Sequence, residues 1–158
     1  MLTKSSSILY LFNFDGTVLG LNRWHGSWTN SKEALLSGPI INPGDKDIRW
    51  HILCNRPVTH KPFVRSCCWL WGLYPKSIHT IPKKILKTKS RKDVLNFKLA
   101  FFRRILIGNH EEFANIKKIF YVDSNLDDIT YLNANRQPFR FVCVHIKDFI
   151  EEKFNILL

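Results

Sequence analysis

The sequence predicts an α/β fold in which a mostly parallel central sheet is flanked by helices. Two observations lead to this prediction. Short apolar segments alternate along the chain with segments of helical periodicity, as in a parallel sheet with helical crossovers. The first of the apolar segments, 7–12, is apolar almost throughout, as strands buried on both faces are.

In the first half of the chain, apolar runs bounded by turn-forming residues mark the strands. The helix in this half is expected to end at Gly72, because glycine readily adopts the left-handed conformation that terminates helices. The elements predicted here are strands at 7–12, 48–54 and 77–82, a helix at 63–72, an irregular segment at 16–47 with room for a short helix at 31–36, and a basic loop at 83–89.

In the second half, the strongest helix signal begins at Ser90. Ser90 and Asp93 have the spacing of a capping box, and the helix is expected to end before Gly108. The elements predicted here are helices at 90–107, 111–115, 126–135 and 147–157, and strands at 118–123 and 139–146.

The length of 158 residues predicts a single domain spanning 1–158, with enough chain to bury a core. No uncharged apolar run approaches the roughly 18 residues that cross a bilayer, and the first apolar segment lacks a small-residue cleavage site. The four cysteines do not have metal-site spacing and are expected to be buried free thiols. We therefore expect a cytoplasmic protein without a membrane partner.

The formal net charge is +11, and much of it is concentrated in one segment. Between Lys83 and Arg104, nine basic residues stand against one acid, so this segment alone carries a charge of +8. Such a surface favours RNA, other nucleic acid or an acidic protein, although a solvated basic face has the same composition. The residues expected to bind a polyanion are Lys83, Lys84, Lys87, Lys89 and Arg91.

Polar residues follow the ends of three predicted strands, namely Asn13 with Asp15, Cys54 with Asn55, and Asp123. In parallel sheets the carboxyl ends of the strands lie at one edge, and ligands bind there. These side chains are therefore expected to lie near one another and to form the candidate site.

The segment after the first strand suits a binding loop. Asn13 and Asp15 are alternate residues that can project toward one cavity, Gly16 permits a sharp turn, and Thr17 offers a hydroxyl and a backbone amide. The alternative interpretation is a simple turn, since Asp-Gly-Thr is a common turn sequence.

Asp123 ends the strand at 118–123, and Asp127 follows one helical turn later. Carboxylates with this spacing suit an oxygen-ligated cation such as Mg²⁺. Alternatively, Asp127 or its neighbour Asp128 caps the next helix. Asp123 itself follows an apolar strand and needs a partner if it is buried.

Lys98 is predicted to lie on the apolar face of the helix at 90–107, near its middle. A lysine among phenylalanines is costly unless its ammonium reaches a buried anion. We expect it to reach the site that holds Asp15 and Asp123, with Arg91 leaning toward the same face. The alternative is that its long stem carries the charge out to solvent.

These motifs resemble those of the haloacid dehalogenase (HAD) superfamily of phosphohydrolases, over about residues 7–146. The family's first motif, D-x-D-G-T after a strand, corresponds to the segment from Asn13 to Thr17. The second, a strand ending in Thr or Ser, corresponds to Cys54 and the residues after it; the lysine motif corresponds to Lys98; and the fourth, D-x-x-x-D, corresponds to Asp123 and Asp127.

The resemblance implies a three-layer Rossmann-like fold without a large cap domain, and Mg²⁺-dependent hydrolysis of a phosphomonoester. An open site of this kind also suits macromolecular substrates such as nucleic-acid ends. The implied catalytic residues are Asn13, at the nucleophile position, Asp15 as acid and base, and Lys98. The implied phosphate-binding residues are Thr17, Cys54, Asn55 and Lys98, and the implied metal ligands are Asn13, Asp15, Asp123 and Asp127.

The chain departs from this family at two of these positions. The nucleophile should be an aspartate, and an asparagine is neutral and a poor nucleophile. Cys54 replaces Thr or Ser with a weaker hydrogen-bond donor. Three accounts stay open: a pseudoenzyme that binds a phosphate, RNA or an acidic partner; a phosphatase inactivated by an Asp-to-Asn change; and hydrolysis by water that Asp15 activates.

Overall fold

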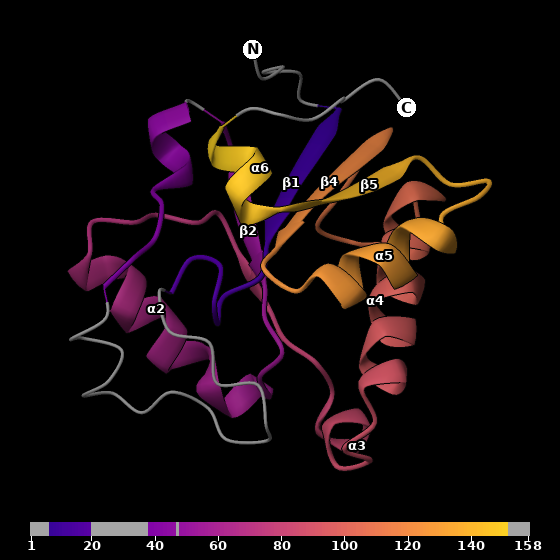
Figure 1. The fold of residues 1–158 in the computed structure, drawn as a ribbon, viewed down its shortest axis with the longest axis horizontal. Helices are drawn as coiled ribbons and strands as arrows, with labels where there is room; N and C mark the ends of the chain where they lie inside the picture. The colour runs from indigo at the N-terminus through magenta and orange to yellow at the C-terminus, as the bar shows by residue number, and fades with distance from the viewer. Residues whose placement is uncertain (1–6, 20–37, 47, 152–158) are drawn as a thin grey trace.

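Five parallel strands form one sheet in the computed structural model, which describes residues 7–19, 38–46 and 48–151 (Figure 1). The strands lie in the order β3-β2-β1-β4-β5, and every neighbouring pair is parallel. The predicted α/β fold with a parallel, Rossmann-like sheet is confirmed. The strands are β1 (Ile8–Phe12), β2 (Trp50–Leu53), β3 (Ile78–His79), β4 (Lys118–Asp123) and β5 (Phe141–His145).

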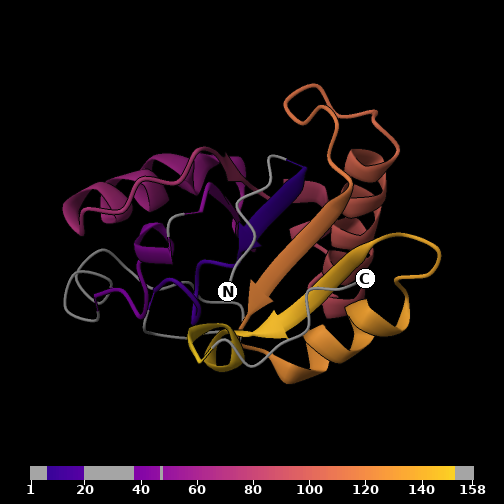
Figure 2. The same cartoon turned by 90° about the horizontal axis from the view of Figure 1, so that it is seen from above.

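Helices cover both faces of this sheet. Figure 2 shows α2 on one side of the strands and α4 and α5 on the other. The helices are α2 (Lys61–Leu70), α3 (Lys83–Leu86), α4 (Arg91–Leu106), α5 (Leu126–Ala134) and α6 (Ile146–Ile150), with short 3₁₀ helices η1 (Pro43–Lys46) and η2 (Val58–His60). No helix among these described elements is both long and apolar enough to cross a bilayer.

The alternation of side chains along the strands creates a separate core on each face. Tyr10 and Phe12 of β1 pack in the core under α2 and α6, while Leu9 and Leu11 pack in the core under α4 and α5. Strands buried on both faces must be apolar at nearly every position, which is why these segments were recognisable in the sequence.

The order of the strands reverses beside β1. The chain places β2 and β3 on one side of β1 and then returns to place β4 and β5 on the other side. Beyond the end of β1, the backbone amide of Asn13 donates to the carbonyl of Val122 at 2.9 Å. The residues that follow β1 and β4 therefore meet at the switch point, where open α/β sheets bind their ligands.

The predicted elements differ from the structure mainly at their ends. The expected basic loop at 83–89 was wrong in part, since residues 83–86 form α3 after Pro82. Residues 111–115 form turns and not the expected helix. The helix expected at 63–72 spans 61–70, with Pro62 in its first turn, where proline is tolerated.

The predicted capping of α4 is confirmed: the Ser90 hydroxyl accepts from the backbone amide of Asp93 at 3.3 Å. The third strand is only two residues long, against the six expected at 77–82. The short helix expected at 31–36 lies outside the described residues, as does the end of the final helix beyond residue 151.

Candidate functional site at the carboxyl edge of the sheet

Asn13 lies at the centre of the candidate site, immediately after β1, and is only 4% exposed. Its side-chain nitrogen donates to the backbone carbonyl of Asp15 and to Oδ1 of Asp123, both at 3.3 Å. Its side-chain oxygen is buried and has no hydrogen-bond partner among the described residues. The amide thus links the ends of β1 and β4 and leaves one buried acceptor unsatisfied.

Asp123 is 1% exposed, yet both of its carboxylate oxygens have partners. Oδ1 also accepts from the backbone amides of Ser124, at 2.6 Å, and Asn125, at 3.3 Å, while Oδ2 accepts from the Tyr121 hydroxyl at 2.9 Å. This answers the question of how a carboxylate is tolerated at the end of an apolar strand: the turn into α5 and a neighbouring phenol supply donors.

Lys98 is completely buried on the face of α4 that contacts the sheet. Its ammonium donates to the Tyr121 hydroxyl at 2.7 Å and lies 3.9 Å from Oδ2 of Asp123. Burial lowers the pKa of Lys98, and the charge of Asp123 opposes this effect. Burial raises the pKa of Tyr121 well above its ordinary value. Lys98 therefore reaches the buried anion, as its helical position predicted, but chiefly through the phenol of Tyr121.

Asp15 is held by a single guanidinium. Arg56, which is 1% exposed, donates from Nε to Oδ2 of Asp15 at 2.8 Å and from a terminal nitrogen to Oδ1 at 2.7 Å. The guanidinium also lies 4.9 Å from the ring centroid of Phe63 and 5.6 Å from that of Phe14. Two parallel charge-assisted hydrogen bonds and flanking rings fix the orientation of the Asp15 carboxylate.

The loop between Asn13 and Val18 is tightly folded. Gly16 has a φ of 76°, in the left-handed region that glycine adopts at little cost. The backbone amides of Thr17 and Leu19 both donate to the carbonyl of Phe14, at 3.2 and 2.8 Å. The Thr17 hydroxyl is buried and has no partner within the described part of the chain. The loop therefore presents a second unsatisfied polar atom close in sequence to that of Asn13.

Of the two acids in the first turn of α5, the buried one is Asp128 and not Asp127, which the sequence had predicted as a metal ligand. Asp127 is exposed to solvent, whereas Asp128 is 2% exposed and pairs with Arg91 of α4. Burial raises the pKa of Asp128, and the hydrogen bond from Arg91 opposes the shift. The cap of α5 is provided by Asn125, whose side-chain oxygen accepts from the backbone amide of Asp128 at 3.0 Å, so the alternative of an aspartate cap was wrong.

The charges of this region balance within the protein. Three acids, Asp15, Asp123 and Asp128, lie against three cations, Arg56, Lys98 and Arg91. Both carboxylate oxygens of Asp15 and both of Asp123 already accept hydrogen bonds from protein donors. Oδ1 and Oδ2 of Asp15 and Oδ2 of Asp123 each accept one hydrogen bond, so a divalent cation here would share these oxygens with Arg56 and Tyr121 and lie near the charges of Arg56 and Lys98.

The residues after β2 lie at the same edge of the sheet as Asn13 and Asp123. The Cys54 thiol is fully buried and donates to the carbonyl of His79 at 3.4 Å, toward β3. Burial raises the pKa of Cys54 to about 11. Asn55 is 7% exposed and stands beside Arg56. The main contribution of this segment is therefore Arg56, through its pairing with Asp15.

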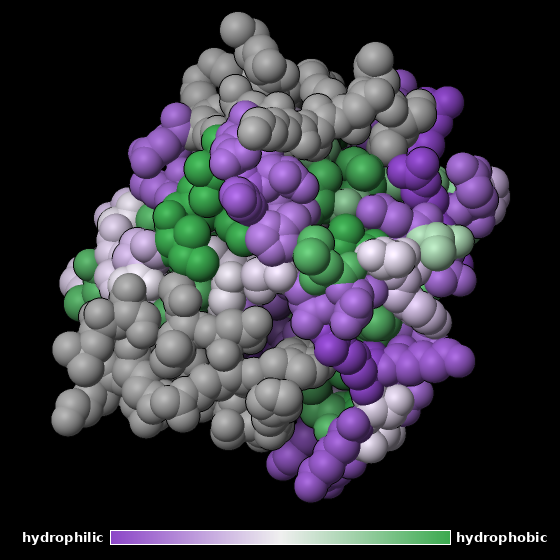
Figure 3. Space-filling view, in the orientation of Figure 1, coloured by the Kyte–Doolittle hydropathy of each residue, from purple (hydrophilic) through white to green (hydrophobic). Residues whose placement is uncertain are grey.

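The predicted polyanion-binding lysines lie beside this edge. Figure 1 shows α3 at the lower edge of the molecule, on the side toward which β1 and β2 run, and Figure 3 shows hydrophilic side chains around it. Four of the predicted residues, Lys83, Lys84, Lys87 and Lys89, are exposed and form no ion pair with a described carboxylate. Arg91 is half-buried and engaged by Asp128, so it belongs to the interior network.

Sequence reasoning missed the roles of Arg56 and Tyr121. Tyr121 is two residues before Asp123 in β4 and therefore shares its face of the sheet, a signal that could have been used, since a buried tyrosine needs a partner for its hydroxyl. Arg56 follows β2 at the same edge as Asp15, and a basic residue at that position could have been considered as its counter-ion.

Comparison of the chain with protein-family models, with curated proteins and with solved structures found no match.

Proposed function

We propose that the chain is a HAD-like domain that binds a phosphorylated polyanion at the carboxyl edge of its sheet and does not hydrolyse it. The state of Asn13 carries this proposal. A carboxamide stands where the resemblance requires the nucleophilic carboxylate, and its nitrogen is directed at Asp123. A carboxamide oxygen is neutral and a poor nucleophile, so covalent attack on phosphorus has no starting group.

Phosphoryl recognition requires hydrogen-bond donors and positive charge near one another. The buried Thr17 hydroxyl is available as a donor within the described residues, and the cations Arg56 and Lys98 flank the same edge. The unsatisfied oxygen of Asn13 accepts a hydrogen bond from a protonated phosphate oxygen or from a bound water. Because Arg56 and Lys98 are already paired with Asp15 and Asp123, the additional positive charge for a phosphorylated ligand comes from the exposed lysines between residues 83 and 89.

The exposed lysines of α3 and its following turn favour a ligand with many negative charges. Such residues contact phosphates without regard to sequence and make binding sensitive to salt. We therefore favour nucleic acid with a terminal phosphate, most simply single-stranded RNA, over an isolated phosphate. An acidic protein partner is the competing ligand and would bind without requiring a phosphorylated end.

Mg²⁺-dependent hydrolysis of a phosphomonoester is the second candidate function. It is favoured by the carboxylates of Asp15 and Asp123, which occupy the switch point together with Lys98. Under this alternative, Asn13→Asp restores the missing nucleophilic carboxylate beside Asp15, and the variant gains hydrolytic activity.

The first test measures binding and phosphate release together. We expect the unmodified chain to bind a fluorescent 3′-phosphorylated RNA oligonucleotide more tightly than its 3′-hydroxyl counterpart, and to release no phosphate with Mg²⁺. Thr17→Val preserves shape and removes the hydroxyl, so it should abolish the preference for the phosphorylated end. Phosphate release by the unmodified chain, lost in Asp15→Asn, would contradict the proposal and establish the second candidate.

The polyanion surface is tested by changing Lys83, Lys84, Lys87 and Lys89 to alanine together. The slope of log affinity against log salt should fall by about three, because each single-strand phosphate contact contributes roughly 0.7. The matched control removes equal charge from exposed positions elsewhere, at Arg65, Lys117, Arg140 and Lys147, and should change the slope far less. Equal effects of the two sets would exclude a specific surface at α3.

A further inference from the structure

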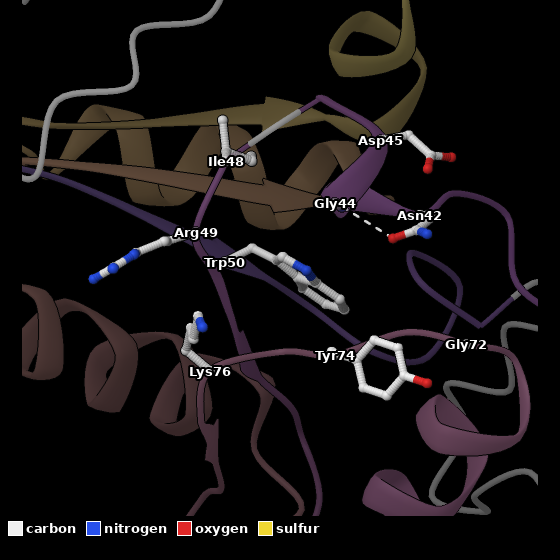
Figure 4. A pocket seen from close by; sticks show the side chains of 9 residues that line it. All are labelled: Asn42, Gly44, Asp45, Ile48, Arg49, Trp50, Gly72, Tyr74 and Lys76. Atoms are coloured by element: carbon white, nitrogen blue, oxygen red, sulfur yellow. Dashed lines mark hydrogen bonds between the residues drawn. The ribbon is translucent and has the colours of Figure 1, made fainter.

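A pocket lies at the amino end of β2, away from the carboxyl edge described above. It has a volume of about 280 Å³ and is formed where η1, the start of β2 and the segment after α2 approach one another. Figure 4 shows the aromatic side chains of Trp50 and Tyr74 on one side of the pocket and the cationic side chains of Arg49 and Lys76 on the other.

The aromatic side of the pocket combines a fixed ring with an accessible one. Trp50 is 3% exposed and is held in the core, where its ring lies edge-on to Phe12 at 5.7 Å between centroids. Tyr74 is 69% exposed, an unusual degree for a large aromatic side chain. Trp50 can therefore form a rigid wall while Tyr74 is free to lie against a planar ligand.

The positive charges on the cationic side of the pocket are not neutralised by a neighbouring acid among the described residues. Arg49 and Lys76 are exposed, and neither forms an ion pair with any residue in the part of the chain that the structure describes. Asp45 of η1 also lines the pocket, but in Figure 4 its carboxylate points away from both aromatic rings and from the cations. The Arg49 guanidinium also extends away from the two rings, on the side of Lys76, so the positive charge gathers at the side of the pocket opposite Tyr74 (Figure 4).

We propose that this pocket binds one nucleotide, with the base against Tyr74 and the phosphate between Arg49 and Lys76. A planar ring joined to an anion by a short polar spacer matches an aromatic wall separated from two cations. The volume is just below the usual range of small-ligand sites, so it suits a single nucleotide unit and not several. A simple inorganic anion would leave the aromatic side unused, and an uncharged ring would leave the cations unused.

The test is a titration of the full chain with AMP, followed by the amide resonances of Gly44 and Gly72, which line the pocket. We expect saturable shifts of both resonances. Gly16, in the loop at the opposite edge of the sheet, is the internal control and should not respond over the same concentration range. Adenosine and ribose 5-phosphate, which lack the charge and the ring respectively, should each bind at least fivefold more weakly than AMP.

Variants of exposed residues distinguish the two sides of the pocket without threatening the fold. Tyr74→Ala should weaken AMP binding at least fivefold, and Tyr74→Phe should restore it, because stacking requires the ring and not the hydroxyl. Lys76→Ala should weaken AMP binding and leave adenosine binding unchanged. Trp69→Ala and Lys92→Ala, at exposed positions outside the pocket, are the matched controls and should bind AMP normally.

A free mononucleotide and the terminal nucleotide of an RNA both combine a base with a phosphate, so the trinucleotide pApApA is compared with AMP. Equal or tighter binding of the trinucleotide identifies the end of an RNA as the ligand, and weaker binding identifies the free nucleotide. The proposal is overturned if Gly44 and Gly72 show no saturable shift up to about 10 mM AMP. It is also overturned if Tyr74→Ala binds AMP as the unmodified chain does, or if ribose 5-phosphate binds as tightly as AMP.

Discussion

The carboxylate of Asp15 accepts two hydrogen bonds from Arg56, one from Nε at 2.8 Å and one from a terminal nitrogen at 2.7 Å, although 41 residues separate the two in sequence. Asp15 belongs to the loop after β1, and Arg56 belongs to the loop after β2. This pair therefore joins the ends of two neighbouring strands. It also settles how the chain carries a guanidinium in its interior, where an unpaired charge would be expensive.

The first prediction concerns this pair. Arg56→Ala should lower the free energy of unfolding by about 3 kcal/mol, because it leaves Asp15 without its cation and removes packing beneath Phe63. Arg56→Lys should have a free energy of unfolding between those of Arg56→Ala and the unmodified chain, since lysine keeps the charge but cannot make the paired hydrogen bonds. Urea unfolding measures both, with the exposed Arg65→Ala as control.

Combining Arg56→Ala with Asp15→Asn tests the pairing itself. The double variant should be less destabilised than the sum of the single variants, because neither leaves a partner behind when both are changed. Additive effects would show that the two side chains stabilise the fold independently, contrary to the arrangement described.

The second prediction concerns the phenol between Lys98 and Asp123. Tyr121→Phe keeps the ring and removes the hydroxyl, so the buried ammonium loses the acceptor at 2.7 Å. We expect a loss of about 1–3 kcal/mol in the free energy of unfolding, the usual cost of an unsatisfied buried polar group. Tyr131→Phe is the matched control, because the Tyr131 hydroxyl donates to Asn96 at the surface, and it should cost little. Equal costs for the two variants would refute the role of Tyr121.

The third prediction concerns magnesium. In Asn13→Asp, the nitrogen that donates to Asp123 becomes an oxygen, which places two carboxylates together and adds an unbalanced negative charge. We expect this variant to have a lower Tm than the unmodified chain in buffer without metal, and to regain stability when Mg²⁺ is added. The unmodified chain, whose acids are already paired, should show no comparable shift of Tm. A large Mg²⁺-dependent shift in the unmodified chain would contradict the charge balance proposed for the site.

The fourth prediction concerns pH. The Ser77 hydroxyl lies 2.6 Å from Nδ1 of His51 and 2.7 Å from Nε2 of His79. Both imidazole rings lie against Phe113, at the margin of the core under α4 and α5. Burial lowers the pKa of both histidines to about 4, from an ordinary value of 6.5. Between these values the unfolded chain binds more protons than the folded chain, so acid favours unfolding.

The stability contributed by these neutral histidines should therefore be complete above about pH 6.5 and decline as the pH falls toward 4. The midpoint of urea unfolding is expected to fall between pH 7.5 and pH 4.5. The double variant His51→Gln, His79→Gln should show a smaller fall over this interval. The prediction fails if the variant and the unmodified chain have the same pH dependence.

Much of the fold could be predicted because its strands are buried on both faces and its longest helix is capped. The apolar face of α4 also predicted the burial of Lys98, and the apolar strand before Asp123 predicted that this acid would need donors. These inferences depend on local periodicity, which the sequence contains directly.

The partners of these residues depended on information that is not local. Arg56 reaches Asp15 only because β2 lies next to β1, and a set of apolar runs does not specify the order of the strands. The choice between Asp127 and Asp128 depended on the rotation of α5, which Asn125 sets by capping its first turn. The direction of the Cys54 thiol likewise depended on the short strand β3 that pairs beside it.

The internal balance of charge at the carboxyl edge has an evolutionary consequence. The hydrogen bonds and ion pairs of the candidate site connect the ends of β1 and β2 to α4 and β4, through Asn13, Arg56, Lys98 and Asp123. The same side chains therefore also stabilise the packing of these elements. Loss of Arg56, Lys98 or Asp123 alone would leave a buried charge without its partner, whatever the site does. Selection for a folded protein is therefore enough to keep these charged residues in place, and their presence is not in itself evidence of catalysis.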